Sequence, residues 1–197
     1  MIEALKSLDT SLFLAINGAH NAFFDFIMFW ASNKLIWIPL YAFLIWLLFK
    51  NYGRKTWLLV LMAGLIIVIT DQTSVHLFKN VFLRLRPCHD PSISDVVHLV
   101  NGKCGGQYGF ISSHAANSFG LAAYLSLLLG KKMKYFTLFI MMWASLLCYS
   151  RVYLGVHYPG DVIVGGLWGA GIGASLYILF YHIDTIVNNR KTHKSIV

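Results

Sequence analysis

Charged side chains are scarce in this sequence. Asp, Glu, Lys and Arg make up 12% of its 197 residues, whereas hydrophobic residues make up 57%. A soluble domain carries about 25% charged residues. This deficit, together with several long apolar runs, excludes an ordinary soluble domain and indicates a helical protein that crosses a membrane several times.

Acidic residues and cysteines are also few. The chain has 8 Asp and Glu and 3 Cys, and it contains neither a carboxylate cluster nor a CxxC or Cys/His spacing that would hold a metal ion. We therefore expect no metal and no other cofactor. Cys88 and Cys104 share one polar loop, whereas Cys148 lies in an apolar run. The first two can form a disulfide if their loop faces an oxidising compartment; two unpaired thiols are the alternative.

The excess of basic residues gives a formal net charge of +8 at pH 7. Such an excess can indicate a nucleic-acid-binding protein, but here the basic residues form short clusters between apolar runs, with no recognition helix. We expect no nucleic acid partner. The positive-inside rule instead places these clusters, and with them the C-terminus, in the cytoplasm. The clustered residues are Lys50, Arg54, Lys55, Lys131, Lys132, Lys134, Arg190, Lys191 and Lys194.

The apolar runs predict an all-α fold: a polytopic membrane bundle of five or six transmembrane helices in a single domain, residues 1–197. Leu5, Leu8, Leu12 and Ile16 recur at helical spacing among charged residues, which is typical of a helix that lies on the membrane surface. Whether the N-terminal part spans the bilayer, and which oligomer the chain forms, both stay open. We expect interfacial or re-entrant helices at 1–32, a central helical bundle at 33–183 and a basic cytoplasmic tail at 184–197. The expected membrane helices cover residues 35–49, 56–85, 113–129, 135–149 and 162–181.

The stretch SRVYLGVHYPGD, residues 150–161, places three ionisable residues between two apolar runs. Ionisable residues in such a position are costly and usually functional. Arg151 carries a permanent charge on a planar donor fork that suits phosphate oxygens. His157 can act as a nucleophile or as an acid and base near neutral pH, and Asp161 can hold its second ring nitrogen. The alternative is that all three residues only cap helix ends.

Two other segments bring polar residues to the same outer ends of the helices. Lys79 and Arg86 are seven residues apart, nearly two helical turns, so both cations are expected on one side of a helix, with Arg84 pointing elsewhere. Ser112 and Ser113 fall, with the histidine that follows them, where a helix begins. A helix N-terminus offers free N–H groups to an anion. The charge pattern predicts that all three segments face out of the cell.

Three cations in one place suit a multiply charged anion, and phosphate fits well. The pair His114 and His157 then has a mechanism, because one imidazole can attack phosphorus while the other protonates the leaving oxygen. Water would later release the phosphohistidine. Cations and helix-end amides can stabilise the charge on the equatorial oxygens.

The spacing of these residues resembles a known family. Lys79-x6-Arg86-Pro87, Ser112-x-His114 and Ser150-Arg151-x5-His157-x3-Asp161 are similar to the three motifs of the type 2 phosphatidic acid phosphatase family, KxxxxxxRP, PSGH and SRxxxxxHxxxD. The resemblance covers Lys79 to Asp161 in the family's order. The second motif departs from the pattern, because Ile111 replaces its proline and Ser113 its glycine; an amide donor survives both changes.

The resemblance implies a role for each matching residue. His157 is expected to be the nucleophile, Asp161 to orient it, and His114 to act as the general acid. Phosphate is expected to bind to Lys79, Arg86, Arg151, Ser112 and the amide of Ser113.

The resemblance also implies a membrane enzyme that hydrolyses a lipid phosphate or diphosphate at the outer face of the bacterial inner membrane. The small size and the outward site resemble bacterial members of the family that recycle undecaprenyl diphosphate, so this lipid is the substrate that the resemblance favours. Phosphatidylglycerol phosphate, phosphatidic acid and the phosphates of lipid A are alternatives, because the motif residues contact the phosphate and not the tail. Vanadate-dependent haloperoxidases share the motifs, but they are soluble. A non-enzymatic anion-binding protein or channel would leave both histidines and Asp161 unexplained.

Overall fold

The computed structural model describes residues 2–194, with side chains from residue 3 to residue 187. These residues form helices joined by turns and by one long loop, and they contain no strand beyond an isolated bridge between Leu85 and Tyr108. The all-α prediction is confirmed. The helices are α1 (Ile2–Gly18), α2 (Ala22–Ala31), α3 (Ile38–Tyr52), α4 (Thr56–Thr73), α5 (Asn80–Phe82), α6 (Ser113–Leu129), α7 (Phe136–Tyr153) and α8 (Pro159–Lys194).

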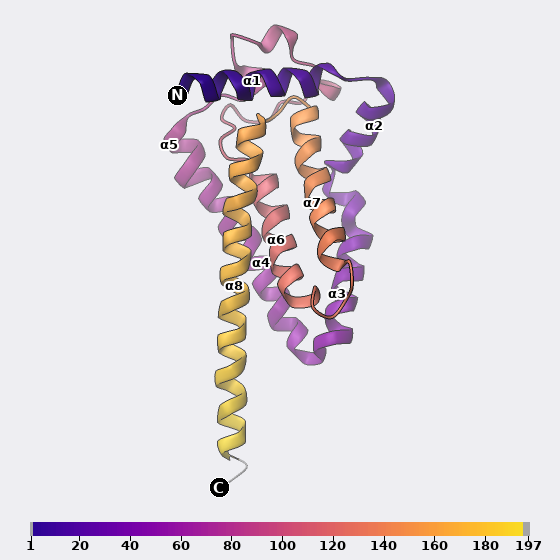
Figure 1. Cartoon of the computed structure of the whole chain (residues 1–197), viewed down its shortest axis with the longest axis vertical. Coiled ribbons are helices and arrows are strands. Elements are labelled where there is room, and N and C mark those ends of the chain that lie inside the picture. The colour runs from indigo at the N-terminus through magenta and orange to yellow at the C-terminus, as the bar shows by residue number, and fades with distance from the viewer. Residues whose placement is uncertain (1, 195–197) are drawn as a thin grey trace.

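Helices α3, α4, α6, α7 and α8 run side by side and form the bundle (Figure 1). Three described stretches are long and apolar enough to cross a membrane: Lys34–Phe82, Phe136–Tyr153 and Pro159–Val187. The first of these turns back at Gly53 and so contributes both α3 and α4. Helix α6 packs against α4, α7 and α8. The fold is therefore a polytopic membrane bundle, as predicted.

Small residues let α8 pack closely on α6. Gly165, Gly169 and Gly173 recur at every fourth position of α8. A Cβ atom on Gly165 would lie 2.7 Å from the carbonyl oxygen of Ser112, and the other two positions have no room for a Cβ beside the α6 backbone. Close helix contact through small residues is common in membranes. Here it presses the beginning of α6 against the beginning of α8.

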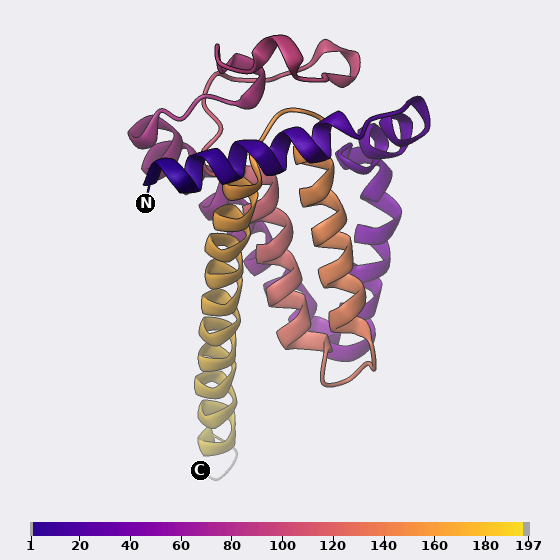
Figure 2. The ribbon, with the colours of Figure 1, turned by 45° about the horizontal axis from the view of Figure 1, so that its top comes forward.

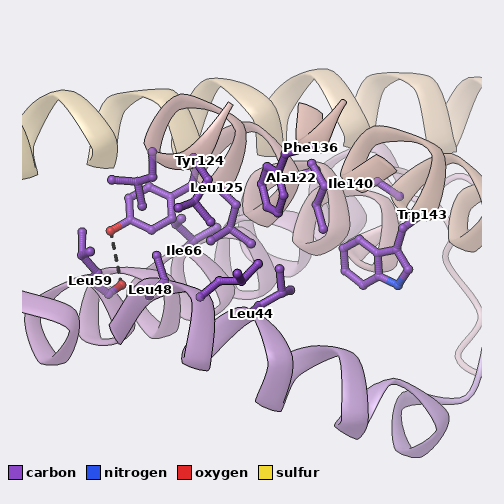
Figure 3. Packing of buried hydrophobic residues seen from close by; sticks show 14 of the residues in the cluster. Leu44, Leu48, Leu59, Ile66, Ala122, Tyr124, Leu125, Phe136, Ile140 and Trp143 are labelled. Carbon is purple, nitrogen blue, oxygen red and sulfur yellow. Dashed lines mark hydrogen bonds between the residues drawn. The ribbon is translucent and has the colours of Figure 1, made fainter. Parts of the chain in front are cut away.

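An apolar core joins α3, α4, α6 and α7 (Figure 3). Tyr124 is fully buried in it, and its hydroxyl donates a hydrogen bond to the carbonyl oxygen of Leu59 at 3.2 Å. A phenol hydroxyl in an apolar setting needs such a partner. This packing sets α4 relative to α6. Other members of the core are Leu44, Leu48, Ile66, Ala122, Leu125, Phe136, Ile140 and Trp143.

Helix α1 lies across one end of the bundle (Figures 1 and 2). Leu5, Leu8 and Leu12 are exposed on it, whereas Phe13 and Asn17 are buried. A row of exposed leucines beside a face that packs on the bundle fits a helix at the membrane surface. The chain then bends by 114° into α2. The predicted N-terminal interfacial helix is therefore present.

Helix boundaries differ from the prediction. The helix expected to reach Leu85 ends at Phe82, because Leu83 adopts a left-handed conformation with φ of 48°. Helix α7 continues to Tyr153, four residues further than expected. Helix α8 begins at Pro159, whose fixed φ suits a first helical turn. Most of the predicted basic tail, residues 184–197, lies outside the described side chains.

Candidate active site

A cavity of about 620 Å³ lies between α3, α4, α6 and α7. Polar residues from three distant segments line part of it. They are Lys79, Arg86, His114, Arg151 and His157. The structure thus brings together five side chains that the three sequence motifs singled out.

The turn between α7 and α8 holds His157 against Asp161, and the two residues are only 1% and 0% exposed. Nδ1 of His157 lies 3.4 Å from Oδ2 of Asp161, while Nε2 lies 2.9 Å from Nη1 of Arg86. A guanidinium can only donate, so Nε2 is the acceptor and the ring proton sits on Nδ1, toward Asp161. This tautomer leaves a lone pair on Nε2, the nitrogen beside the cations.

The surroundings of His157 also keep its ring neutral. Burial lowers the pKa of His157 well below its usual range, and the charges of Arg86, Arg151 and Lys79 lower it further. A neutral imidazole at pH 7 retains the lone pair that a nucleophile needs. The geometry and the charges around His157 therefore both favour a nucleophile.

Arg151 reaches the cavity from the last turn of α7. Its Nη1 donates a hydrogen bond to the hydroxyl of Ser32, whereas its Nε is buried without a hydrogen-bond partner among the described residues. A buried donor left unpaired costs about 1–3 kcal/mol. An anion in the cavity would satisfy this donor, and phosphate oxygens match the fork of the guanidinium.

Arg86 and Lys79 are held in place by other protein groups. Arg86 donates hydrogen bonds from Nε to the carbonyl oxygen of Gly106 at 2.6 Å and from Nη1 to that of Val156 at 2.9 Å. Nζ of Lys79 donates to the hydroxyl of Ser113 at 2.7 Å. Lys79 also ends a π-helical stretch that follows α4, a rare geometry that is frequent at functional sites. These contacts position both cations before any ligand arrives.

The two serines at the beginning of α6 differ in placement. The hydroxyl of Ser112 accepts a hydrogen bond from the N–H of Ala115 at 3.4 Å, and the N–H of Ser112 donates to the carbonyl oxygen of Asp161 at 2.9 Å. Ser113 and His114 line the cavity, whereas Ser112 does not. Ser112 therefore caps the helix, and the structure does not bring it to the cavity with the other predicted phosphate ligands.

The remainder of the cavity is mostly apolar and lies deeper in the bundle. A slot of this kind can enclose a hydrocarbon chain while polar groups hold the head group. The apolar residues that line it are Trp37, Tyr41, Leu44, Ile45, Leu48, Val60, Ala63, Ile67, Leu121, Leu125, Trp143 and Leu147.

The helical-wheel reason for pairing Lys79 with Arg86 is wrong. The helix ends before Arg86, and an extended segment that pairs with the loop at Tyr108 carries this side chain to the cavity. Arg84, which the wheel set aside, donates a hydrogen bond to Asp161 at 2.9 Å. Arg84 lies between Lys79 and Arg86 in the sequence, which pointed to a place near the site, but the assumed helical periodicity turned it away from them.

Lys34 and Asp71 also line the cavity, although neither belongs to one of the three motifs. Asp71 lies in the polar half of a long apolar segment, and an ionisable residue in such a segment usually indicates a functional site. Lys34 lies near the start of a membrane run, where a basic residue is ordinary.

The long loop between α5 and α6 is closed by a disulfide between Cys88 and Cys104, whose Cα atoms are 6.1 Å apart. His89 lies close to this disulfide. Among the described residues, one further group has ligand atoms within 4.8 Å of one another, as metal ligands do. It consists of His20, Asp25 and His98. Neither group includes a residue that lines the cavity.

Comparison with known sequences gives a family match and several relatives. Residues 54–184 match the family model described as the PAP2 superfamily. The lipid A 4′-phosphatase of Bacteroides thetaiotaomicron is 42% identical over 184 residues, which cover 92% of this chain and 80% of the relative. The lipid A 4′-phosphatase of Porphyromonas gingivalis is 34% identical and covers 92% and 76%. The undecaprenyl-diphosphatase of Sulfolobus acidocaldarius is 31% identical and covers 83% and 74%.

A solved structure shares the fold. The crystal structure of a transmembrane PAP2-type phosphatidylglycerolphosphate phosphatase from Bacillus subtilis superposes with a TM-score of 0.65. The match covers 93% of this chain and 88% of that one, at 21% identity. At this identity the likeness concerns the arrangement of the helices.

Proposed function

This chain belongs to the PAP2 superfamily and is a membrane lipid phosphatase, and from that premise we propose that it removes the 4′-phosphate of lipid A. The observation that carries the proposal is the 42% identity to a lipid A 4′-phosphatase, which extends over 92% of the chain and so well beyond residues 54–184. The substrate favoured from the sequence, undecaprenyl diphosphate, is not confirmed, because the relative of that name is less similar, at 31%.

The cavity supports a lipid phosphate of this kind. Its polar part presents Lys79, Arg86 and Arg151 to an anion, and its apolar part lies within the membrane bundle. A phosphate on an acylated sugar can bind the cations while an acyl chain enters the slot. Three cations, two histidines and an apolar slot together fit a lipid phosphatase better than an anion-binding protein or channel.

In the first step of the proposed mechanism, Nε2 of His157 attacks phosphorus and the bond between phosphorus and the sugar oxygen breaks. His114 donates its proton to that oxygen as it leaves. Arg86 and Arg151 hold the equatorial oxygens, where charge must be stabilised in the transition state. The Nδ1 proton stays directed at Asp161. The products are the dephosphorylated lipid and a phosphohistidine.

In the second step, water attacks the phosphohistidine, and His114 accepts a proton from that water. The bond between nitrogen and phosphorus breaks, inorganic phosphate leaves, and both histidines return to their starting forms. The cations supply the positive charge that a metal ion supplies in many other phosphoryl-transfer enzymes. The scheme uses no metal ion and no other cofactor.

We also propose that the enzyme lies in the bacterial inner membrane with its active site toward the periplasm and its C-terminus in the cytoplasm. The turns that carry Lys55 and Lys132 lie at the end of the bundle opposite α1 (Figure 1). Basic residues at that end favour the cytoplasm. The disulfide in the loop at the other end fits an oxidising compartment.

The substrate proposal is tested by kcat/KM of the purified protein on four defined lipids: lipid A with both phosphates, undecaprenyl diphosphate, phosphatidylglycerol phosphate and phosphatidic acid. We expect the highest value for lipid A, with mass spectrometry showing loss of the 4′-phosphate and retention of the other. Fast release from undecaprenyl diphosphate, with none from lipid A, would overturn the proposal while leaving the chain a lipid phosphatase.

A further inference from the structure

Arg84 connects two carboxylates that come from opposite ends of the chain. Its Nη1 donates a hydrogen bond to Oδ1 of Asp161 at 2.9 Å, and its Nη2 donates to Oδ2 of Asp9 at 2.7 Å. Its guanidinium carbon also lies 4.2 Å from the centre of the Tyr158 ring. The fork and the ring contact leave Arg84 little freedom to turn.

Asp9 belongs to α1, which precedes the residues matched by the family model. Its second oxygen, Oδ1, accepts a hydrogen bond from the N–H of Gly160 at 2.7 Å. A Cβ atom on Gly160 would lie only 2.8 Å from Oδ2 of Asp9 and would push the Asp9 carboxylate away from this position. Asp9 therefore contacts both Arg84 and the beginning of α8, where Asp161 stands four residues after His157.

These ion pairs are more sheltered than ordinary surface pairs. The side chains of Asp9 and Arg84 are 15% and 28% exposed, and that of Asp161 is 0% exposed. Water screens such a pair less than it screens an exposed one. Oδ2 of Asp161, the oxygen that faces Nδ1 of His157, also accepts a hydrogen bond from the N–H of Tyr158 at 3.1 Å, whereas Oδ1 is held by Arg84. Arg84 therefore helps to set how the Asp161 carboxylate is turned toward Nδ1 of His157.

We propose that Asp9 is a positioning residue for the reaction. It holds Arg84 and the Gly160 N–H, Arg84 holds Asp161, and Asp161 orients the imidazole of His157. The interfacial helix α1 thereby completes the active site, although it lies outside the residues matched by the family model and Asp9 does not line the cavity. The proposal rests on the roles of His157 and Asp161 proposed above.

The test is a double-mutant cycle in the full-length protein with Asp9→Asn and Arg84→Gln. Asp9→Asn keeps the shape and removes one charge, whereas Arg84→Gln removes the charge and the donor fork and leaves a shorter polar side chain. Because neither residue lines the cavity, each variant should lower kcat about tenfold, as loss of a group that orients a reacting side chain typically does, and should leave KM within about twofold. Because both act through one network, the double variant should be little worse than either single variant.

Glu3→Gln is the matched control, since it removes the same charge from the exposed end of the same helix, where the Glu3 side chain is 87% exposed. It should leave kcat unchanged. The Tm of each variant is measured as well. A lower kcat at an unchanged Tm indicates positioning of the site, whereas a lower Tm indicates that the residue anchors α1 on the bundle. The inference would be overturned if Asp9→Asn kept the full wild-type kcat per folded molecule. It would also be overturned if the decreases in kcat of the two single variants multiplied in the double variant. Activity retained in a parallel His157→Ala variant would instead overturn the proposed mechanism.

Discussion

Replacing His157 by alanine should abolish phosphate release, with a fall in kcat on the order of 10⁴-fold or more, as expected when a nucleophile is removed. No other described side chain combines burial with a ring nitrogen that accepts a hydrogen bond from Arg86. The imidazole is held at both nitrogens, so no neighbour can take its place. The measurement is single-turnover release of phosphate from the lipid that the wild-type enzyme hydrolyses fastest.

His89→Ala is the control for this prediction. His89 lies in the loop between α5 and α6 and is exposed, and its side chain hydrogen-bonds to the carbonyl oxygen of Gly105 and not to a residue that lines the cavity. This variant should keep near wild-type activity. The His157→Ala protein should insert into membranes as the wild type does, and it should elute at the same volume in size-exclusion chromatography. Activity within tenfold of wild type in a folded His157→Ala protein would rule out the nucleophile assignment.

Replacing Arg151 by lysine should lower kcat/KM roughly 10²-fold, a magnitude typical for loss of one donor that stabilises transition-state charge. The charge is kept, but the planar fork is lost, and with it the buried Nε that has no partner among the described residues. A lysine cannot offer two parallel donors to phosphate oxygens. Steady-state kinetics on the preferred lipid give the ratio.

Arg54→Lys serves as the comparison, because Arg54 is exposed in the turn between α3 and α4, away from the cavity. It should behave as the wild type. If Arg151→Lys were also fully active, the fork of Arg151 would not bind phosphate in the transition state, and the arrangement of cations proposed here would need revision.

Local spacing explains what could be predicted from the sequence. His157 and Asp161 are four residues apart, so a local turn and the first turn of α8 are enough to bring them close together. The apolar runs and basic clusters likewise predicted a membrane bundle with its polar groups at one end. Lys79 and Arg86 both line the cavity, but not through the helical spacing predicted for them, since a left-handed residue ends the helix between them.

Tertiary contacts explain what could not be predicted. Arg84 and Asp9 are 75 residues apart in sequence, and only the way α1 crosses the bundle brings them together. Ser112 carries a hydroxyl suited to phosphate but does not line the cavity, and its N–H donates to the carbonyl oxygen of Asp161 at the beginning of α8. Lys34, in the short segment before α3, lines the cavity although it belongs to none of the three motifs.

A covalent intermediate on His157 is the most direct test of the account. The enzyme would be mixed with its preferred lipid phosphate, quenched in base within one turnover, and digested for mass spectrometry under conditions that preserve phosphohistidine. We predict a phosphoryl group on the peptide that contains His157, formed and lost at rates that match turnover. Steady hydrolysis with no phosphorylated peptide, or with the phosphoryl group on another residue, would contradict it.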